Sequence, residues 1–138
     1  MDRTYRNLAF GSVVANLPEL LLRHLLSQER VALIIEVSGD RYVQFLARED
    51  QKLIVECISN RFLDDDFRLD LDDEMRLLDA GFSPPGIEAE PHPNWWWSSD
   101  DVADVMVACT MGALALVEVL RVPRSERVTL VERNLAIT

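Results

Sequence analysis

The residues that could do chemistry are few and do not form a catalytic pattern. The chain has two histidines: His24 lies in a leucine-rich segment, and His92 lies between two prolines. No HExxH zinc motif, nucleophile elbow or glycine-rich phosphate loop is present. Glu56 is the one carboxylate expected to be partly buried on a strand, and a lone acid without a paired acid or base is a weak sign of catalysis. We therefore expect a protein that is not an enzyme and that uses no metal or cofactor.

Three consecutive tryptophans, from Trp95 to Trp97, are the only ones in the chain and follow a proline-rich segment. In an extended backbone successive side chains point to opposite faces, so Trp96 faces away from the direction that its two neighbours share. One large ring should therefore remain at the surface. It could lie along the loop or contact a ligand, as tryptophan often does at interfaces.

Residues 64–79 contain eight acidic residues and two arginines, a local charge of −6. Their spacing lacks the glycine and the final glutamate of a calcium-binding loop. Helix capping explains the acids better, because Asp70 or Asp72 can begin a short helix whose end Gly81 would cap. The stretch is then a solvated loop and helix, or a docking patch for a basic partner.

Length and composition predict a single globular domain over residues 1–138, because 49% of the residues are hydrophobic. The net charge of −10, with Lys52 as the only lysine, argues against DNA or RNA as a partner. Cys57 and Cys109 lie in apolar runs and should be buried, reduced thiols. The first 30 residues lack a signal-peptide pattern, and no uncharged stretch reaches the roughly 20 residues that cross a bilayer. We expect a cytoplasmic protein without membrane insertion.

A helix is predicted from Asn16, which can cap it, through Pro18 in the first turn to about Glu29. Its core stripe would comprise Leu17, Leu20, Leu21 and Leu25. Leu22 and Leu26 fall outside this stripe, so the helix has more apolar surface than one sheet face can cover. The excess could be a subunit contact or a ligand wall.

Three β-rich segments with short loops between them predict an antiparallel meander: residues 31–37, 41–47 and 52–58. Alternation places Gln44 and Leu46 on the same face as Glu56. Both faces of this sheet have substantial apolar content. We therefore expect a second layer or a bound segment to cover the face with Gln44 and Glu56.

A second long helix is predicted from Ser98 or Ser99, either of which can cap it, to about Arg121, before Pro123. It is apolar almost all round, so it is either central or covered by another subunit. Its only polar-to-small strip contains Asp104, Ala108, Met111, Ala115 and Glu118. Residues 126–133 alternate enough to form a further, edge-like strand.

This order of elements, with Tyr-Val-Gln-Phe at 42–45 and Pro-Asn-Trp at 93–95, resembles a known family over about residues 15–122. The family is the actinobacterial, TY-Chap-type group of the type III secretion chaperone and YbjN-like superfamily. The resemblance implies an α+β fold, with an antiparallel meander packed against helices in the order α-β-β-β-α-α and an extra C-terminal strand as an option. It also implies a homodimer without catalysis that binds extended or partly folded protein segments.

The leading interpretation is thus a non-enzymatic, cytoplasmic chaperone or adaptor for client proteins, which could be linked to secretion. The expected peptide contacts are Leu22, Leu26, Gln44, Leu46, Glu56, Trp95 and Trp96. One alternative is a fixed regulatory or assembly subunit of a protein complex. Another is a small apolar ligand bound between the sheet and the last helix, in a pocket lined by Phe45, Met106 and Cys109.

Overall fold

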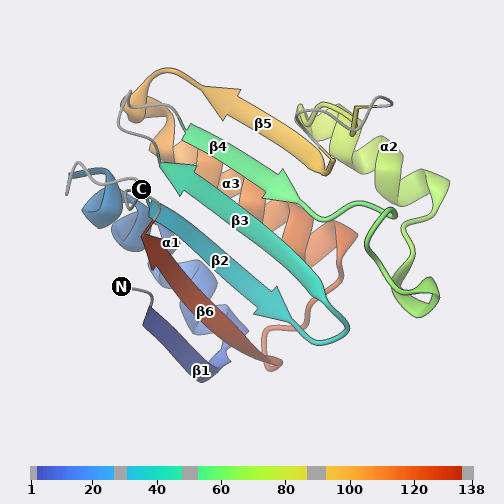
Figure 1. Ribbon diagram of the computed structural model, residues 1–138, viewed down its shortest axis with the longest axis horizontal. Helices are drawn as coiled ribbons and strands as arrows, with labels where there is room; N and C mark the ends of the chain where they lie inside the picture. Colours follow the sequence, from blue (N-terminus) through green and yellow to red (C-terminus); the bar gives the residue numbers. More distant parts are fainter. Residues whose placement is uncertain (1–2, 27–30, 48–52, 87–92, 135–138) are drawn as a thin grey trace.

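The computed structural model describes residues 3–26, 31–47, 53–86 and 93–134. Within these ranges six strands form one sheet in the order β1-β6-β2-β3-β4-β5, and every neighbouring pair is antiparallel. Helices α1 and α3 lie behind one face of the sheet, and α2 stands beside the β5 end (Figure 1). The predicted α+β class is confirmed. In chain order the elements are β1 (Arg3–Ala9), α1 (Phe10–Leu26), β2 (Val31–Val37), β3 (Arg41–Ala47), β4 (Leu53–Cys57), α2 (Leu71–Ala80), β5 (Trp95–Ser99), α3 (Val105–Leu114) with a π-helical extension (Ala115–Val119), and β6 (Arg127–Asn134). Two short 3-10 helices lie in the connections before α2 (Asp65–Phe67) and before α3 (Val102–Asp104).

The predicted meander is confirmed, because β2, β3 and β4 are consecutive neighbours in the sheet. Gly39 and Asp40 both adopt positive φ, at 77° and 59°, which lets the chain turn tightly between β2 and β3. Alternation along β3 points Val43 and Phe45 into the core beneath the helices, while Gln44 lies half-buried on the other face. The strand faces were therefore predictable from the period of the pattern alone.

Helix α1 begins at Phe10, so the prediction of a start at Asn16 was wrong. The first two backbone N–H groups of the helix donate to the segment before β6: Phe10 N to Glu126 O at 2.9 Å and Gly11 N to Arg124 O at 3.0 Å. These tertiary bonds replace a side-chain cap. Pro18 then lies inside the helix, where it removes a single hydrogen bond of the ladder.

The C-terminal segment forms a strand as predicted, but not at the edge of the sheet. β6 pairs with β2 on one side and with β1 on the other, so it is an interior strand. The edge is β1, whose first residues are exposed and polar and therefore showed no alternation in the sequence. Long-range pairing, which sequence periodicity does not report, decides this order.

Helix α3 starts at Val105, later than predicted, because Ser98 and Ser99 continue β5 by pairing with β4. The strip expected to be its most polar is largely buried: Ala108 and Ala115 face the core. Gly112 permits the close approach, since a Cβ placed on it would lie 2.1 Å from Phe45 Cζ. The small residues thus seat α3 on the sheet, and the apolar residues of its other side remain exposed.

The short acidic helix is confirmed as α2. Asp73 N donates to Asp70 Oδ1 at 2.8 Å and Asp70 N donates to Asp73 Oδ2 at 3.1 Å, which completes a capping box. Gly81 ends the helix with φ 111°. Sequence signals within a few residues of one another were sufficient to predict both ends.

Candidate functional site

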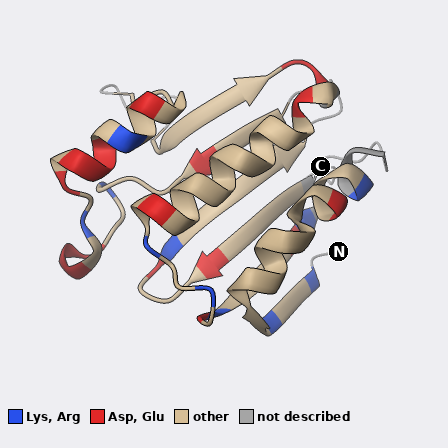
Figure 2. Ribbon diagram, turned by 180° about the vertical axis from the view of Figure 1, so that it is seen from behind, with Lys and Arg blue, Asp and Glu red and all other residues tan. Residues whose placement is uncertain are grey.

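The face of the sheet turned away from α1 and α3 has no helix over it in the described part of the chain. It is the near face in Figure 1, whereas Figure 2 shows the helices in front of the sheet. We call it the uncovered face. Following the register and the alternation, its side chains are Thr4, Ala32, Ile34, Glu36, Tyr42, Gln44, Leu46, Ile54, Glu56, Trp96, Ser98, Thr129, Val131 and Arg133.

One row of this face crosses the whole sheet. The strand register aligns Thr4, Val131, Ile34, Gln44, Glu56 and Trp96 from β1 to β5. Leu46 lies in the next row, between Ala32 and Ile54. The row changes in character along its length: it is apolar over β6 and β2, polar over β3 and β4, and aromatic at β5.

The apolar part of the face forms a small cluster of its own. Ala32, Ile34 and Val131 are buried, and Tyr42 and Leu46 pack beside them half-buried. A sheet face that only meets water usually carries polar side chains at alternate positions. On this face the buried cluster forms a floor, and the half-buried side chains of Tyr42, Leu46 and Trp96 supply the accessible apolar surface around a few polar groups, as in ligand-binding surfaces.

The polar part of the row is a hydrogen-bonded pair. Gln44 Nε2 donates to Glu56 Oε2 at 2.7 Å, and both side chains are half-buried. The bond fixes the direction of the carboxylate. A carboxylate can accept several hydrogen bonds, so Glu56 keeps capacity for backbone N–H groups or for a basic side chain.

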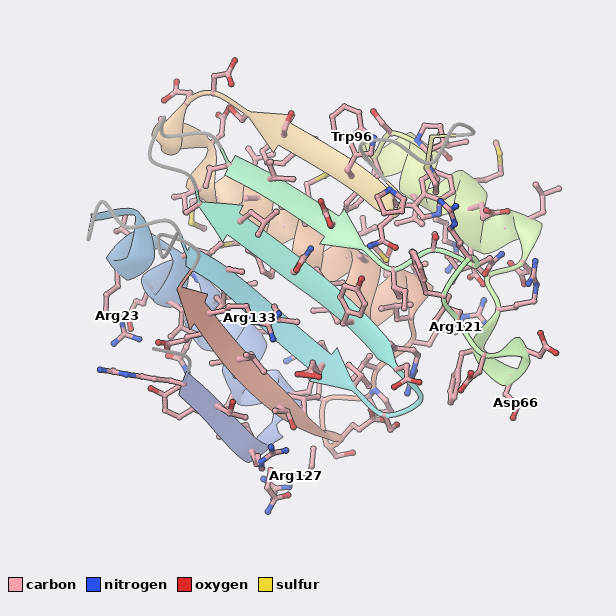
Figure 3. All side chains as sticks on the ribbon, in the orientation of Figure 1. Arg23, Asp66, Trp96, Arg121, Arg127 and Arg133 are labelled. Carbon is pink, nitrogen blue, oxygen red and sulfur yellow. The ribbon has the colours of Figure 1, made fainter. Side chains whose placement is uncertain are left out.

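The tryptophans alternate as predicted. Trp95 is 3% exposed and belongs to the core, and Trp97 packs against the same core. Trp96 points to the uncovered face, near the end of the sheet beside α2 (Figure 3). Its backbone is held by Ser83, with Ser83 N to Trp96 O at 2.7 Å and Trp96 N to Ser83 O at 3.1 Å.

A buried hydrogen-bond network sets the position of β5, and it joins the two short motifs of the sequence. Asn94 Nδ2 donates to the Tyr42 hydroxyl at 2.9 Å, and Ser59 N donates to Asn94 Oδ1 at 3.1 Å. Ser59 Oγ donates to Pro93 O at 2.9 Å. Burial raises the pKa of the Tyr42 hydroxyl, which keeps it protonated at neutral pH. The Pro-Asn-Trp segment therefore anchors the strand that presents Trp96.

The structure brings together four of the predicted contact residues, Gln44, Leu46, Glu56 and Trp96, all on the uncovered face. Leu22 is 45% exposed but belongs to α1, on the opposite side of the sheet. The side chains of Leu26 and His24, and all of His92, lie outside the described residues. The predicted set therefore does not form one surface.

Trp95 lies in the core but also lines a cavity of about 280 Å³ beside Ser59, Glu74 and Pro85. Its indole nitrogen has no hydrogen-bond partner among the described residues. Trp95 therefore borders this cavity and does not face the uncovered face.

Sequence reasoning missed the contribution of β6 to the uncovered face. Val131 and Arg133 lie beside Ile34 and Ala32 because β6 pairs with β2. The alternation of residues 126–133 was the available signal, but it gives the faces of a strand and not its neighbours.

The alternative of an apolar pocket between the sheet and the last helix named three lining residues, and the structure does not bring them together around one cavity. Phe45 is buried against Gly112, Cys109 is buried, and Met106 is 57% exposed on the outer side of α3. Burial raises the pKa of the Cys57 thiol to about 12 and that of Cys109 to about 11, so both are poor nucleophiles at neutral pH. Over the described ranges, no cluster of three or more histidines, cysteines or acids could hold a metal ion.

None of the described helices is long and apolar enough to span a membrane. No curated protein and no solved structure matches the chain. The family model described as "T3SS (YopN, CesT) and YbjN peptide-binding chaperone 3" matches residues 13–133. The match reaches past the predicted limit at residue 122 and includes most of β6. The chain therefore belongs to the TY-Chap3 family of peptide-binding chaperone domains.

Proposed function

We propose that this domain is a non-enzymatic cytoplasmic chaperone or adaptor that binds extended or partly folded segments of client proteins on the uncovered face. The observation that carries the proposal is the row of Gln44, Glu56 and Trp96 beside the apolar cluster, on a sheet face without a helix in the described chain. Membership of a peptide-binding family supports it. A link to secretion would depend on which client binds.

The chemistry of the face indicates the kind of segment that it would accept. Tyr42, Leu46 and Trp96, which are half-buried, offer apolar contacts to client side chains above the buried cluster around Ile34. Between them, the Glu56 carboxylate would accept hydrogen bonds from client N–H groups or basic side chains. The net charge of −10 favours neutral or basic segments and keeps the complex in solution.

A basic, permanently unfolded protein is a suitable probe: reduced, S-carbamidomethylated lysozyme, with native lysozyme as the folded control of similar charge. We expect the unfolded form to bind and the native form not to. Trp96→Ala should weaken binding about tenfold, the size of a strong contact residue. Leu46→Ser should weaken it less, and neither change should shift the thermal transition of the chaperone by more than a few degrees.

Leu22→Ser is the matched control, because it removes an exposed leucine from the opposite layer. It should leave binding unchanged. If Leu22→Ser abolishes binding while Trp96→Ala does not, the client surface lies on the helices. Equal binding of native and unfolded lysozyme would show that the interaction depends on charge alone, and it would refute a chaperone function.

We also propose that the domain forms a homodimer through the outer side of α3. Met106, Val107 and Val117 are all more than two fifths exposed there. A row of exposed apolar side chains of this kind suits contact with a second copy. Val117→Lys should halve the mass measured by light scattering, whereas Leu78→Lys, an equally exposed position on α2, should not. An unchanged mass in Val117→Lys would exclude this dimer contact.

A further inference from the structure

We propose that the outer face of α2 is a second docking surface, and that it binds a basic amphipathic helix of a partner protein. Leu71, Met75 and Leu78 follow the i, i+4, i+7 spacing that aligns side chains along one side of a helix. They are 72%, 47% and 43% exposed. This surface is separate from the uncovered face of the sheet.

The apolar stripe is not needed for the attachment of α2 to the domain. Leu77 and Asp73, on the opposite side of the helix, are buried and provide that contact. Arg121 Nη2 holds the buried Asp73 Oδ1 at 3.0 Å, which adds an ion pair to the inner side. A helix whose inner side is already satisfied would normally carry polar residues outside, so three aligned apolar side chains indicate a partner.

Acidic residues border the stripe on both sides. At about 100° per residue, Asp72 and Asp79 flank it on one side and Glu74 on the other. The acids of α2 and of the loop before it gather at one end of the molecule (Figure 2), and Asp66 marks that loop in Figure 3.

The arginines near the acidic border of the stripe do not neutralise it, because they bind other groups or lie outside the helix. Arg76 Nη1 donates to Glu118 O at 3.3 Å, and Arg121 pairs with Asp73. Arg68 lies in the loop that precedes the helix. The rim of the stripe itself is therefore acidic, which calls for a partner with basic residues.

This charge pattern selects the occupant. A partner helix with an apolar stripe and flanking lysine or arginine residues would match the stripe and its rim together. A second copy of this chain would bring acidic rims against each other, which disfavours self-association here.

Trp96 and Leu46 lie on the uncovered face of the sheet and take no part in the α2 surface.

Two synthetic helical peptides with the same leucine stripe provide the test, one flanked by lysines and one by glutamates. Fluorescence anisotropy with the full chain should show that the lysine peptide binds at least tenfold more tightly than the glutamate peptide. Asp72→Asn combined with Asp79→Asn should weaken lysine-peptide binding several-fold and reduce its dependence on salt.

Met75→Gln should weaken lysine-peptide binding about tenfold. Met106→Gln, which changes an exposed methionine of α3, is the matched control and should have no effect. Amide chemical shifts of the wild-type protein should change along residues 71–80 on titration, which locates the site independently of any variant.

Equal binding of the two peptides, or equal loss in Met75→Gln and Met106→Gln, would overturn the proposal. Dissociation of a dimer by Leu78→Lys would replace the basic partner with a second copy. This test is independent of the proposed client surface on the sheet, because Trp96→Ala should leave peptide binding to α2 unchanged.

Discussion

At the scale of single residues, α3 packs closely on the sheet because glycine and alanine occupy its contact positions. Gly112 lies over the ring of Phe45, and Ala108 and Ala115 extend the same close approach along the helix. Phe45, which was predicted to line a ligand pocket here, is therefore packed against α3 instead. The client surface that we propose lies on the other side of the sheet, where Gln44 and Glu56 are held together by a hydrogen bond.

Gly112→Ala should destabilise the fold, because its Cβ would lie 2.1 Å from Phe45 Cζ. We expect a loss of about 1–3 kcal/mol in the free energy of unfolding, the usual cost of overpacking a core. Gly11→Ala is the matched helical control, since its Cβ would lie 3.4 Å from the Arg124 side chain. Urea denaturation measures both; equal stability of the two variants would contradict the close contact.

The two cysteines should be inert in the folded protein. Burial raises the pKa of Cys57 to about 12 and that of Cys109 to about 11, so the reactive thiolate is scarce at pH 8. We expect a thiol reagent to label neither residue in native protein at this pH and to label both in guanidinium chloride. Rapid native labelling of Cys57 would show that β4 opens or is not covered.

At the scale of elements, predictions from sequence succeeded where short-range signals act and failed where distant segments meet. Asp70 and Gly81 define α2 by local bonds, and alternation gives the faces of β3. The start of α1 depends instead on the bond from Phe10 N to Glu126 O, between residues far apart in sequence. The same holds for the candidate site. Strand alternation correctly predicted that Gln44 and Glu56 share one face, but no short-range sequence signal indicates that Leu22 lies in the other layer.

Asp70→Ala should loosen α2 without unfolding the sheet. The backbone N–H of Asp73 lowers the pKa of the Asp70 carboxyl, so the charged cap persists in mild acid and is lost as the pH falls through that lowered pKa. Hydrogen exchange at neutral pH should be faster in α2 of the variant and unchanged in β2 and β3. Asp66→Ala, in the preceding loop, should have no such effect; faster exchange throughout Asp70→Ala would show that α2 supports the whole domain.

At the scale of the whole molecule, the domain separates three surfaces. The sheet is covered by α1 and α3 on one side, within the described chain, and presents the apolar and acidic row on the other. We propose different neighbours for the outer side of α3 and for the stripe of α2, because acidic residues border the α2 stripe on both sides. In the arrangement that we propose, a client would lie on the sheet while the helices make other contacts.

Site-specific photo-crosslinking tests the central claim most directly. A benzoylphenylalanine introduced at Trp96 is compared with one at Leu22, each irradiated with reduced, S-carbamidomethylated lysozyme. We predict a crosslinked product from position 96, lost on competition with unlabelled unfolded lysozyme, and none from position 22. A product from position 22 alone would contradict the account and place the client on the helical layer.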